Sequence, residues 1–124
     1  MARVLVVDDD PTIRSLVGMA LEDAGYEVVQ AASGSAALTA LGPGTLHPDV
    51  ILLDMRMPGM DGWEFASRYR AQAGPKAPIV VMTAAQDAAH RAAQIAADTF
   101  LSKPFDLGAL YDCVARFTVA PCQA

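Results

Sequence analysis

The sequence predicts an α/β domain built on a doubly wound, five-stranded parallel sheet, with five helices distributed over both faces. Short aliphatic runs at 4–7, 50–53 and 79–82 are typical of parallel strands that are buried on both faces. Helix-start signals and helical periodicity separate these runs, so strands and helices alternate. The 124 residues are enough for one domain, which we expect over 1–124, with a core at about 3–118 and a short tail at 119–124.

The first half of the chain predicts two strands and two helices. A strand over 3–8 leads to Asp10-Pro11, an N-cap followed by proline at the first helical position. Apolar residues recur along this helix at helical spacing and predict one buried stripe, formed by Ile13, Leu16, Val17, Ala20 and Leu21. Gly25 ends the helix. A more polar strand over 26–31 is expected at a sheet edge, and Ser33 caps a short helix that ends before Gly42-Pro43-Gly44.

The second half predicts three strands, over 49–53, 78–83 and 99–102. Asp61 caps the helix that follows the turn-rich loop 57–60, and Glu64 stands three positions on, as in a capping box. A helix over about 86–96 has high helix propensity, but Ile95 is its one large aliphatic residue, so we expect it to be weakly held. Asp106 caps the last helix, which ends at 117 and has an apolar stripe of Leu107, Leu110, Tyr111, Val114 and Phe117.

Polar residues follow four of the strands. Asp8-Asp9-Asp10, Asp54, Thr83 and Lys103 each stand where an aliphatic run ends. Because ligands bind outside the carboxyl ends of the strands in an open parallel sheet, these side chains are expected in one cleft. Carboxylates, a hydroxyl and an ammonium group suit a divalent cation and a phosphoryl group. Asp10 is better explained as the helix cap than as a metal ligand.

Composition narrows the class of protein. The net charge is −5, the pI is about 4.7 and there is no basic tract, so nucleic acid is an unexpected direct partner. No apolar stretch approaches the roughly 18 residues of a membrane span, and no signal-peptide pattern is present, which favours the cytoplasm. Two cysteines, Cys113 and Cys122, make a poor disulfide framework and are expected to be reduced thiols.

This order of motifs resembles the receiver domain of bacterial two-component response regulators, the CheY-like family. The resemblance runs from about residue 3 to residue 117, and its markers are the acidic cluster, Asp54, Thr83, Lys103-Pro104-Phe105 and the Met57-to-Gly62 loop. It implies a flavodoxin-like fold with strand order 2-1-3-4-5, which we take from the family because the sequence itself does not give it.

The resemblance also implies the roles of individual residues. Asp54 would be the phosphoacceptor. Mg²⁺, for which Mn²⁺ can substitute, would be held by Asp8, Asp9, Asp54 and the backbone carbonyl of Arg56. Thr83, Lys103 and the backbone of Ala84 would contact the phosphate. Thr83 and Phe100 would form the switch, Pro104 would follow a cis bond, and Arg56 and Ala85 would tune the lifetime of the phosphate.

The implied function is a phosphorylation-dependent switch and not a turnover enzyme. The phosphoryl group would come from a histidine kinase or a histidine phosphotransfer protein. Phosphorylation would shift a protein-binding face formed by helix 86–96, strand 99–102 and helix 106–117, toward a downstream target or effector domain. The chain would be a monomer or a phosphorylation-dependent homodimer. Phe100 stands where tyrosine is more usual, so its contact with a partner lacks the hydroxyl.

Two rival functions remain open at the level of sequence. Asp8-x-Asp10-x-Thr12 resembles the nucleophile motif of haloacid-dehalogenase-type phosphatases, although that reading leaves Asp54 unexplained and finds no cap domain. A receiver-like interaction module that no longer takes phosphate is the second rival, but the acid, hydroxyl and ammonium positions are all present. Nucleotide-binding folds are disfavoured because no glycine-rich phosphate loop follows the first strand.

Overall fold

A computed structural model describes residues 2–42, 47–55, 57, 59–72, 76–84, 90, 93, 97–103 and 106–118. Strands and helices alternate over most of this length. Their bounds are β1 (Arg3–Val7), α1 (Pro11–Asp23), β2 (Glu27–Ala31), α2 (Gly34–Ala40), β3 (Val50–Asp54), α3 (Gly62–Ala71), β4 (Ile79–Ala84), β5 (Thr99–Lys103) and α5 (Leu107–Phe117). The predicted strands agree to within about one residue at each end, as boundary assignments usually do.

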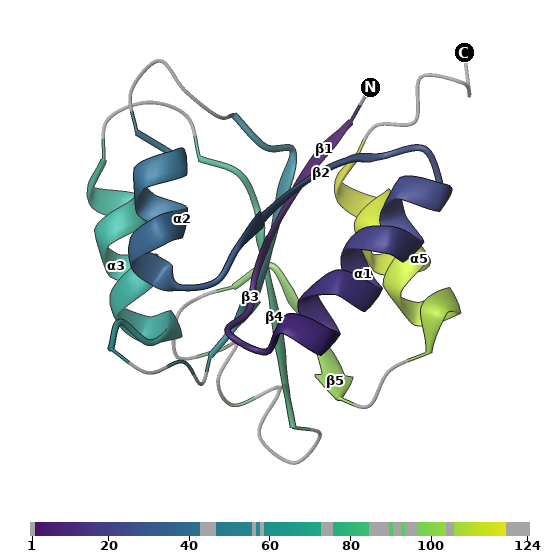
Figure 1. Ribbon diagram of the computed structural model, residues 1–124. Coiled ribbons are helices and arrows are strands. Elements are labelled where there is room, and N and C mark those ends of the chain that lie inside the picture. The colour runs from purple at the N-terminus through teal and green to yellow at the C-terminus, as the bar shows by residue number, and fades with distance from the viewer. Residues whose placement is uncertain are drawn as a thin grey trace.

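The five strands form one parallel sheet in the order β2-β1-β3-β4-β5, as the family resemblance implied. The more polar strand β2 lies at an edge, which confirms the prediction from its composition. Helices α2 and α3 cover one face of the sheet, and α1 and α5 cover the other (Figure 1). Because all five strands are parallel, their carboxyl ends lie along one side of the sheet, at the bottom of Figure 1; we call this side the carboxyl edge.

Four helices are present in the part of the chain that the structure describes. The helix expected over 86–96 lies outside the described residues except at positions 90 and 93, which are helical, so the fifth helix stays a prediction. None of the described helices combines the length and the apolar character needed to cross a membrane.

The central strands bury both of their faces. Leu5 and Val7 of β1 pack with the cluster beneath α2 and α3, whereas Val4 and Val6 pack with the cluster beneath α1 and α5. All four side chains are completely buried, and β3 and β4 alternate in the same way. Alternate side chains of a strand point to opposite faces, so burial of both faces explains why these runs are aliphatic throughout.

Side-chain caps fix where the helices begin. The Asp10 carboxylate accepts hydrogen bonds from the backbone N–H groups at the start of α1, Ser33 caps α2 and Asp106 caps α5, all as predicted. Asp61 accepts the Glu64 N–H at 2.9 Å and caps α3. The Glu64 carboxylate pairs with Arg68 one turn later, so the reciprocal half of the predicted capping box is replaced by an i,i+4 ion pair.

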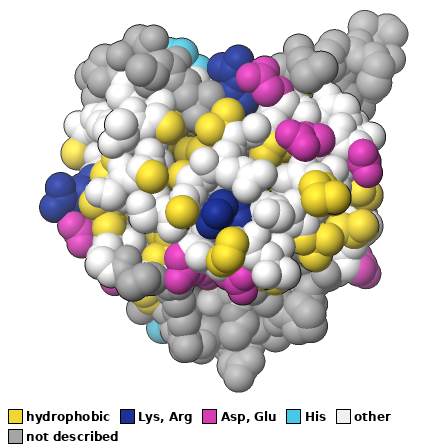
Figure 2. All heavy atoms as spheres, in the orientation of Figure 1, with side chains coloured by type: hydrophobic (Ala, Val, Ile, Leu, Met, Phe, Trp, Pro, Cys, Tyr) yellow, Lys and Arg dark blue, Asp and Glu magenta, His cyan; other side chains and the backbone are white. Residues whose placement is uncertain are grey.

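Two of the predicted buried stripes are narrower than expected. Leu16 of α1 is 54% exposed and Leu107 of α5 is 43% exposed. The arc of α1 that meets the sheet is centred on Val17 and Leu21, and Leu16 lies about 100° around the helix from Val17. Met19 is also exposed, and Figure 2 shows hydrophobic side chains gathered over α1 on this face.

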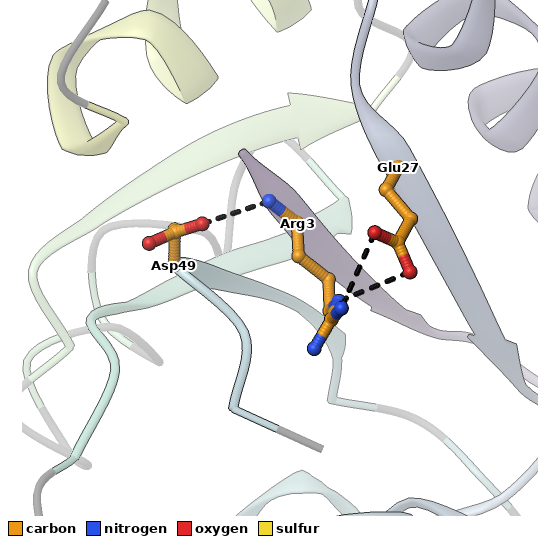
Figure 3. Close-up of polar contacts among 3 residues, drawn as sticks. All are labelled: Arg3, Glu27 and Asp49. Atoms are coloured by element: carbon orange, nitrogen blue, oxygen red, sulfur yellow. Dashed lines mark hydrogen bonds and ion pairs between the residues drawn. The ribbon is translucent and has the colours of Figure 1, made fainter. Parts of the chain in front are cut away.

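A polar cluster joins three strands at their amino ends, opposite the carboxyl edge. Arg3 of β1 donates its backbone N–H to the Asp49 carboxylate at 2.8 Å, just before β3 (Figure 3). The Arg3 guanidinium pairs with Glu27 of β2, with Nε 3.1 Å from Oε2. This cluster reinforces the pairing of β1 with its two neighbours, and its exposed ion pair contributes about 1 kcal/mol at most.

Cys113 of α5 is a free, buried thiol in the core beneath α1 and α5, and Cys122 lies outside the described residues. Burial raises the pKa of the Cys113 thiol, and the nearby charge of Arg116 partly opposes that effect. The thiol is therefore protonated at neutral pH and is a poor nucleophile, which assigns Cys113 to packing.

Candidate functional site

Three carboxylates meet at the carboxyl edge of the sheet. Asp8 and Asp9 follow β1, and Asp54 is the last residue of β3, the strand paired with β1. Ligand oxygens of all three lie within 4.8 Å of one another. Asp8 is completely buried, Asp54 is 6% exposed and Asp9 is exposed, so two of the carboxylates are shielded from water and the third is accessible to it. The sequence predicted that these residues would converge, and the structure brings them together.

The backbone and the helix cap hold Asp8 in place. Its N–H donates to the Ala31 carbonyl of β2 at 3.2 Å, and its Oδ1 accepts the Asp10 N–H at 2.9 Å. The Asp10 carboxylate is occupied in turn by the N–H groups of Thr12 and Ile13. Asp10 is thus the helix cap that we predicted, and the nucleophile motif of the rival phosphatase loses its second aspartate to that role.

The start of α3 packs against the backbone next to Asp54. Met55, the next residue, is completely buried, and its carbonyl accepts the Gly62 N–H at 3.1 Å. A β-carbon at position 62 would lie 2.8 Å from the Met55 Cα and would also overlap the Met55 sulfur. Glycine at position 62 therefore allows α3 to begin directly against the backbone that carries Asp54.

We predict that Gly62→Ala will destabilise the protein by about 1–3 kcal/mol, since the added methyl meets backbone that cannot rotate away. Gly108→Ala in α5 is the matched control, because the nearest atom to its β-carbon would be 3.4 Å away. That variant should be neutral or up to about 1 kcal/mol more stable, owing to the higher helix propensity of alanine. Chemical denaturation of both variants measures the difference, and equal stabilities would show that the contact at Met55 relaxes freely.

Thr83 and Lys103 also reach this edge through the sheet register. Asp54 pairs with Met82 of β4, and Thr83 is the next residue along that strand, where it is 2% exposed. Lys103 ends β5 and pairs with Ala84. The backbone therefore brings the ends of β3, β4 and β5 side by side; the side chains of Ala84 and Lys103 lie outside the described residues.

Phe100 of β5 pairs with Val81 and is 41% exposed in this structure. Its role as part of the switch stays a prediction. The remaining predicted site residues, Arg56, Ala85 and Pro104, lie outside the described residues, so their roles stay predictions.

The donor set fits a small, hard cation. Oxygens bound to one Mg²⁺ lie about 2.1 Å from the ion, so they are about 3–4 Å from one another, close to the spacing of this cluster. Carboxylate oxygens suit a hard cation such as Mg²⁺ better than Zn²⁺, which prefers nitrogen and sulfur ligands. Figure 2 shows acidic side chains at the lower edge of the face, where β1 leads into α1.

Comparison with known families agrees with this geometry. The family model described as the response regulator receiver domain matches residues 4–115. The chain belongs to this family. Receiver domains act in two-component signalling, and aspartate phosphorylation and Mg²⁺ binding are general among them.

Relatives of this receiver domain include a longer regulator. The DNA-binding response regulator MtrA of Mycolicibacterium smegmatis is 38% identical over 105 residues, which are 83% of this chain and 44% of MtrA. The chain therefore spans less than half the length of that relative.

Solved structures of similar length share the fold. The chemotaxis response regulator CheY4 of Vibrio cholerae is 36% identical with a TM-score of 0.84, covering 95% of this chain and 99% of CheY4. The response regulator TrrA of Thermotoga maritima, solved in complex with Mg²⁺-BeF, is 33% identical with a TM-score of 0.81, covering 95% of this chain and all of TrrA.

One residue beside the receiver site was not singled out from the sequence. Arg14 of α1 is half-buried, and its Nη1 donates to the backbone carbonyl of Asp8 at 2.8 Å. A basic residue within an amphipathic helix ordinarily indicates a solvated position, so its spacing alone gave no signal.

Proposed function

We propose that this chain is the phosphorylation-dependent switch of a two-component phosphorelay, with Asp54 as the phosphoacceptor. The observation that carries the proposal is the convergence of Asp8, Asp9 and Asp54 within 4.8 Å at the carboxyl edge of the sheet. Thr83, buried one residue beyond the strand partner of Asp54, adds the hydroxyl that a phosphoryl group requires.

The proposed reaction is a transfer from a histidine to a carboxylate. An oxygen of Asp54 attacks the phosphorus of a phosphohistidine, the P–N bond breaks, and the imidazole of the kinase or phosphotransfer protein leaves with the electron pair. The product is an acyl phosphate on Asp54. Water later attacks the phosphorus and breaks the bond to Asp54, which restores the carboxylate and resets the switch.

The other residues position the phosphoryl group and balance its charge. Mg²⁺ bound by Asp8, Asp9, Asp54 and the Arg56 carbonyl would supply charge neutralisation, and Mn²⁺ would serve in its place. Thr83 donates its hydroxyl to a phosphate oxygen, Lys103 contributes a positive charge, and the backbone N–H of Ala84 donates a further hydrogen bond. Arg56 and Ala85 set how long the phosphate survives.

The output would be a population shift. Movement of Thr83 toward the phosphate draws its loop inward and lets Phe100 turn from its exposed position toward the core. A cis bond before Pro104, as the family resemblance implies, would aim Lys103 at the site. The face formed by the fifth helix over 86–96, β5 and α5 then binds or releases a downstream protein or effector domain.

The proposal also covers the location, oligomeric state and partners of the chain. The chain acts as a cytoplasmic signalling domain without ordinary enzymatic turnover. It exists as a monomer or as a homodimer that depends on phosphorylation. With a net charge of −5 and no basic tract, the chain itself makes no direct contact with nucleic acid.

Exposure of the purified protein to acetyl phosphate, with and without Mg²⁺, tests the proposed function. Intact mass should increase by one phosphoryl group only when Mg²⁺ is present. Trp63 lies in the first turn of α3, which begins against Met55, so its fluorescence should change when Mg²⁺ or phosphate binds at Asp54. An unchanged mass in the presence of Mg²⁺ would favour the rival interaction module that takes no phosphate.

A further inference from the structure

Arg14 connects the first helix to the first metal-site residue. Its backbone N–H donates to the Asp10 carbonyl at 2.9 Å, and its guanidinium reaches back to the Asp8 carbonyl at 2.8 Å. One residue therefore contacts both ends of the segment 8–10. This segment has left the strand but has not yet entered the helix, so its carbonyls need partners from elsewhere.

The contact falls on the residue whose orientation matters most. Asp8 is completely buried, so its carbonyl is shielded from water. The N–H of Asp8 is held by Ala31 and its Oδ1 by the Asp10 N–H, and the guanidinium holds the remaining backbone atom. Hydrogen bonds to the peptide groups on both sides of the Asp8 Cα leave the Asp8 carboxylate little freedom to turn away from Asp9 and Asp54.

The charge of Arg14 makes this placement informative. A guanidinium beside a cation site repels the incoming Mg²⁺, so its charge alone weakens metal binding. Its hydrogen bond acts in the opposite direction, because it holds a ligand in the geometry that Mg²⁺ requires. Removal of the Arg14 side chain should therefore raise Mg²⁺ affinity if its charge matters more, and lower Mg²⁺ affinity if its hydrogen bond matters more.

We propose that Arg14 is a positioning residue of the metal site, which fixes the Asp8 carbonyl and thereby directs the Asp8 carboxylate toward Asp9 and Asp54. The inference rests on the proposed function, since it concerns the same site. It assigns to α1 a part in Mg²⁺ affinity, although no α1 side chain is proposed as a ligand.

The test compares Mg²⁺ affinity of the parent, Arg14→Met and Arg14→Lys by titration calorimetry. Methionine is unbranched, like the stem of arginine, and has a similar helix propensity, but it is shorter and has neither the charge nor the donors. Arg14→Met should bind Mg²⁺ about 10-fold more weakly than the parent, the typical effect of removing a group that orients a metal ligand. Arg14→Lys keeps the charge but replaces the planar guanidinium by a flexible ammonium group, so its affinity should fall between the two.

Arg68→Met is the matched control, because it makes the same change in charge at an exposed position of α3. Its Mg²⁺ affinity should remain within about twofold of the parent. In the metal-free protein, the amide resonance of Asp10, which reports the bond to Asp8, should shift in Arg14→Met and stay unchanged in Arg68→Met.

Equal or tighter Mg²⁺ binding by Arg14→Met would overturn the inference, since only the charge would then matter. If Arg14→Met does not fold, Arg14→Lys decides alone, and parent-like affinity would count against positioning. A parent that binds Mg²⁺ and takes phosphate keeps the proposed function even when the inference fails. A parent that binds no Mg²⁺ removes both.

Discussion

Replacing Asp54 by Asn should abolish phosphorylation and, at the same time, make the metal-free protein more stable. The amide has no nucleophilic oxygen of comparable strength, so exposure to acetyl phosphate and Mg²⁺ should leave the mass unchanged. The gain in stability has a separate cause. Asp54 lies within 4.8 Å of two other carboxylates, and its removal eliminates two of the three repulsive pairs.

The size of this gain follows from Coulomb's law. Two unit charges about 4.8 Å apart at an effective dielectric of about 20 repel by roughly 3.5 kcal/mol. Exposure of Asp9 and screening by salt reduce that figure, so we expect Asp54→Asn to gain about 2 kcal/mol. For a domain of this size that is an increase in Tm of about 5–10 °C in metal-free buffer. Adding Mg²⁺ should raise the Tm of the parent more than that of the variant.

Asp61→Asn serves as the control for a lost negative charge. Asp61 caps α3 through the Glu64 N–H, and asparagine caps equally well. This variant should take phosphate normally and keep its stability to within about 0.5 kcal/mol. If Asp54→Asn still incorporated phosphate, the phosphoacceptor would have to be another residue. An unchanged Tm would show that the three carboxylates do not repel in the folded protein.

The sequence was most informative where a single local rule operates. Aliphatic runs predicted strands buried on both faces, and Val4 to Val7 alternate between the two halves of the core. Short polar side chains predicted where helices begin, and Asp10, Ser33, Asp61 and Asp106 each accept the expected N–H. Both rules act within a few residues, so no tertiary information was needed.

Features that depend on the packing partner were less predictable. Leu16 and Leu107 fit the helical spacing of their stripes but remain exposed, because the sheet covers a narrower arc of each helix. The strand order came from the family resemblance and not from the residues. Asp54 proved to be the last residue of β3, because pairing with Met82 extends the strand by one position.

The residues of the candidate site show the same contrast between what the sequence predicts and what depends on packing. Asp8, Asp9, Asp54 and Thr83 could be placed together because each lies at, or within two residues of, the carboxyl end of a strand, and the carboxyl ends of parallel strands share one edge of the sheet. Arg14 could not be placed, since its contact with the Asp8 carbonyl spans six residues and depends on how the loop turns into α1. Residues that act through the backbone of another residue leave little pattern in the sequence.

Phe65→Ala should cause the largest loss of stability that we predict. Phe65 lies in α3, is completely buried and stacks on Tyr69 with ring centroids 5.9 Å apart. Truncation of a buried phenylalanine to alanine costs about 3–5 kcal/mol through lost transfer energy and the cavity left behind. Native domains are stable by only about 5–15 kcal/mol, so the Tm should fall by roughly 12–20 °C.

Phe117→Ala in α5 makes the same chemical change at a half-buried position, where the ring packs at the edge of the other core cluster beneath Arg116. Less apolar area is lost there, so we expect a cost of about 1 kcal/mol. Urea denaturation of both variants at matched pH and salt measures the difference. Similar losses would mean that the core beneath α2 and α3 collapses around the missing ring. A clearly larger loss in Phe65→Ala would show that this ring is part of the packing that holds α3 against the sheet beside Met55.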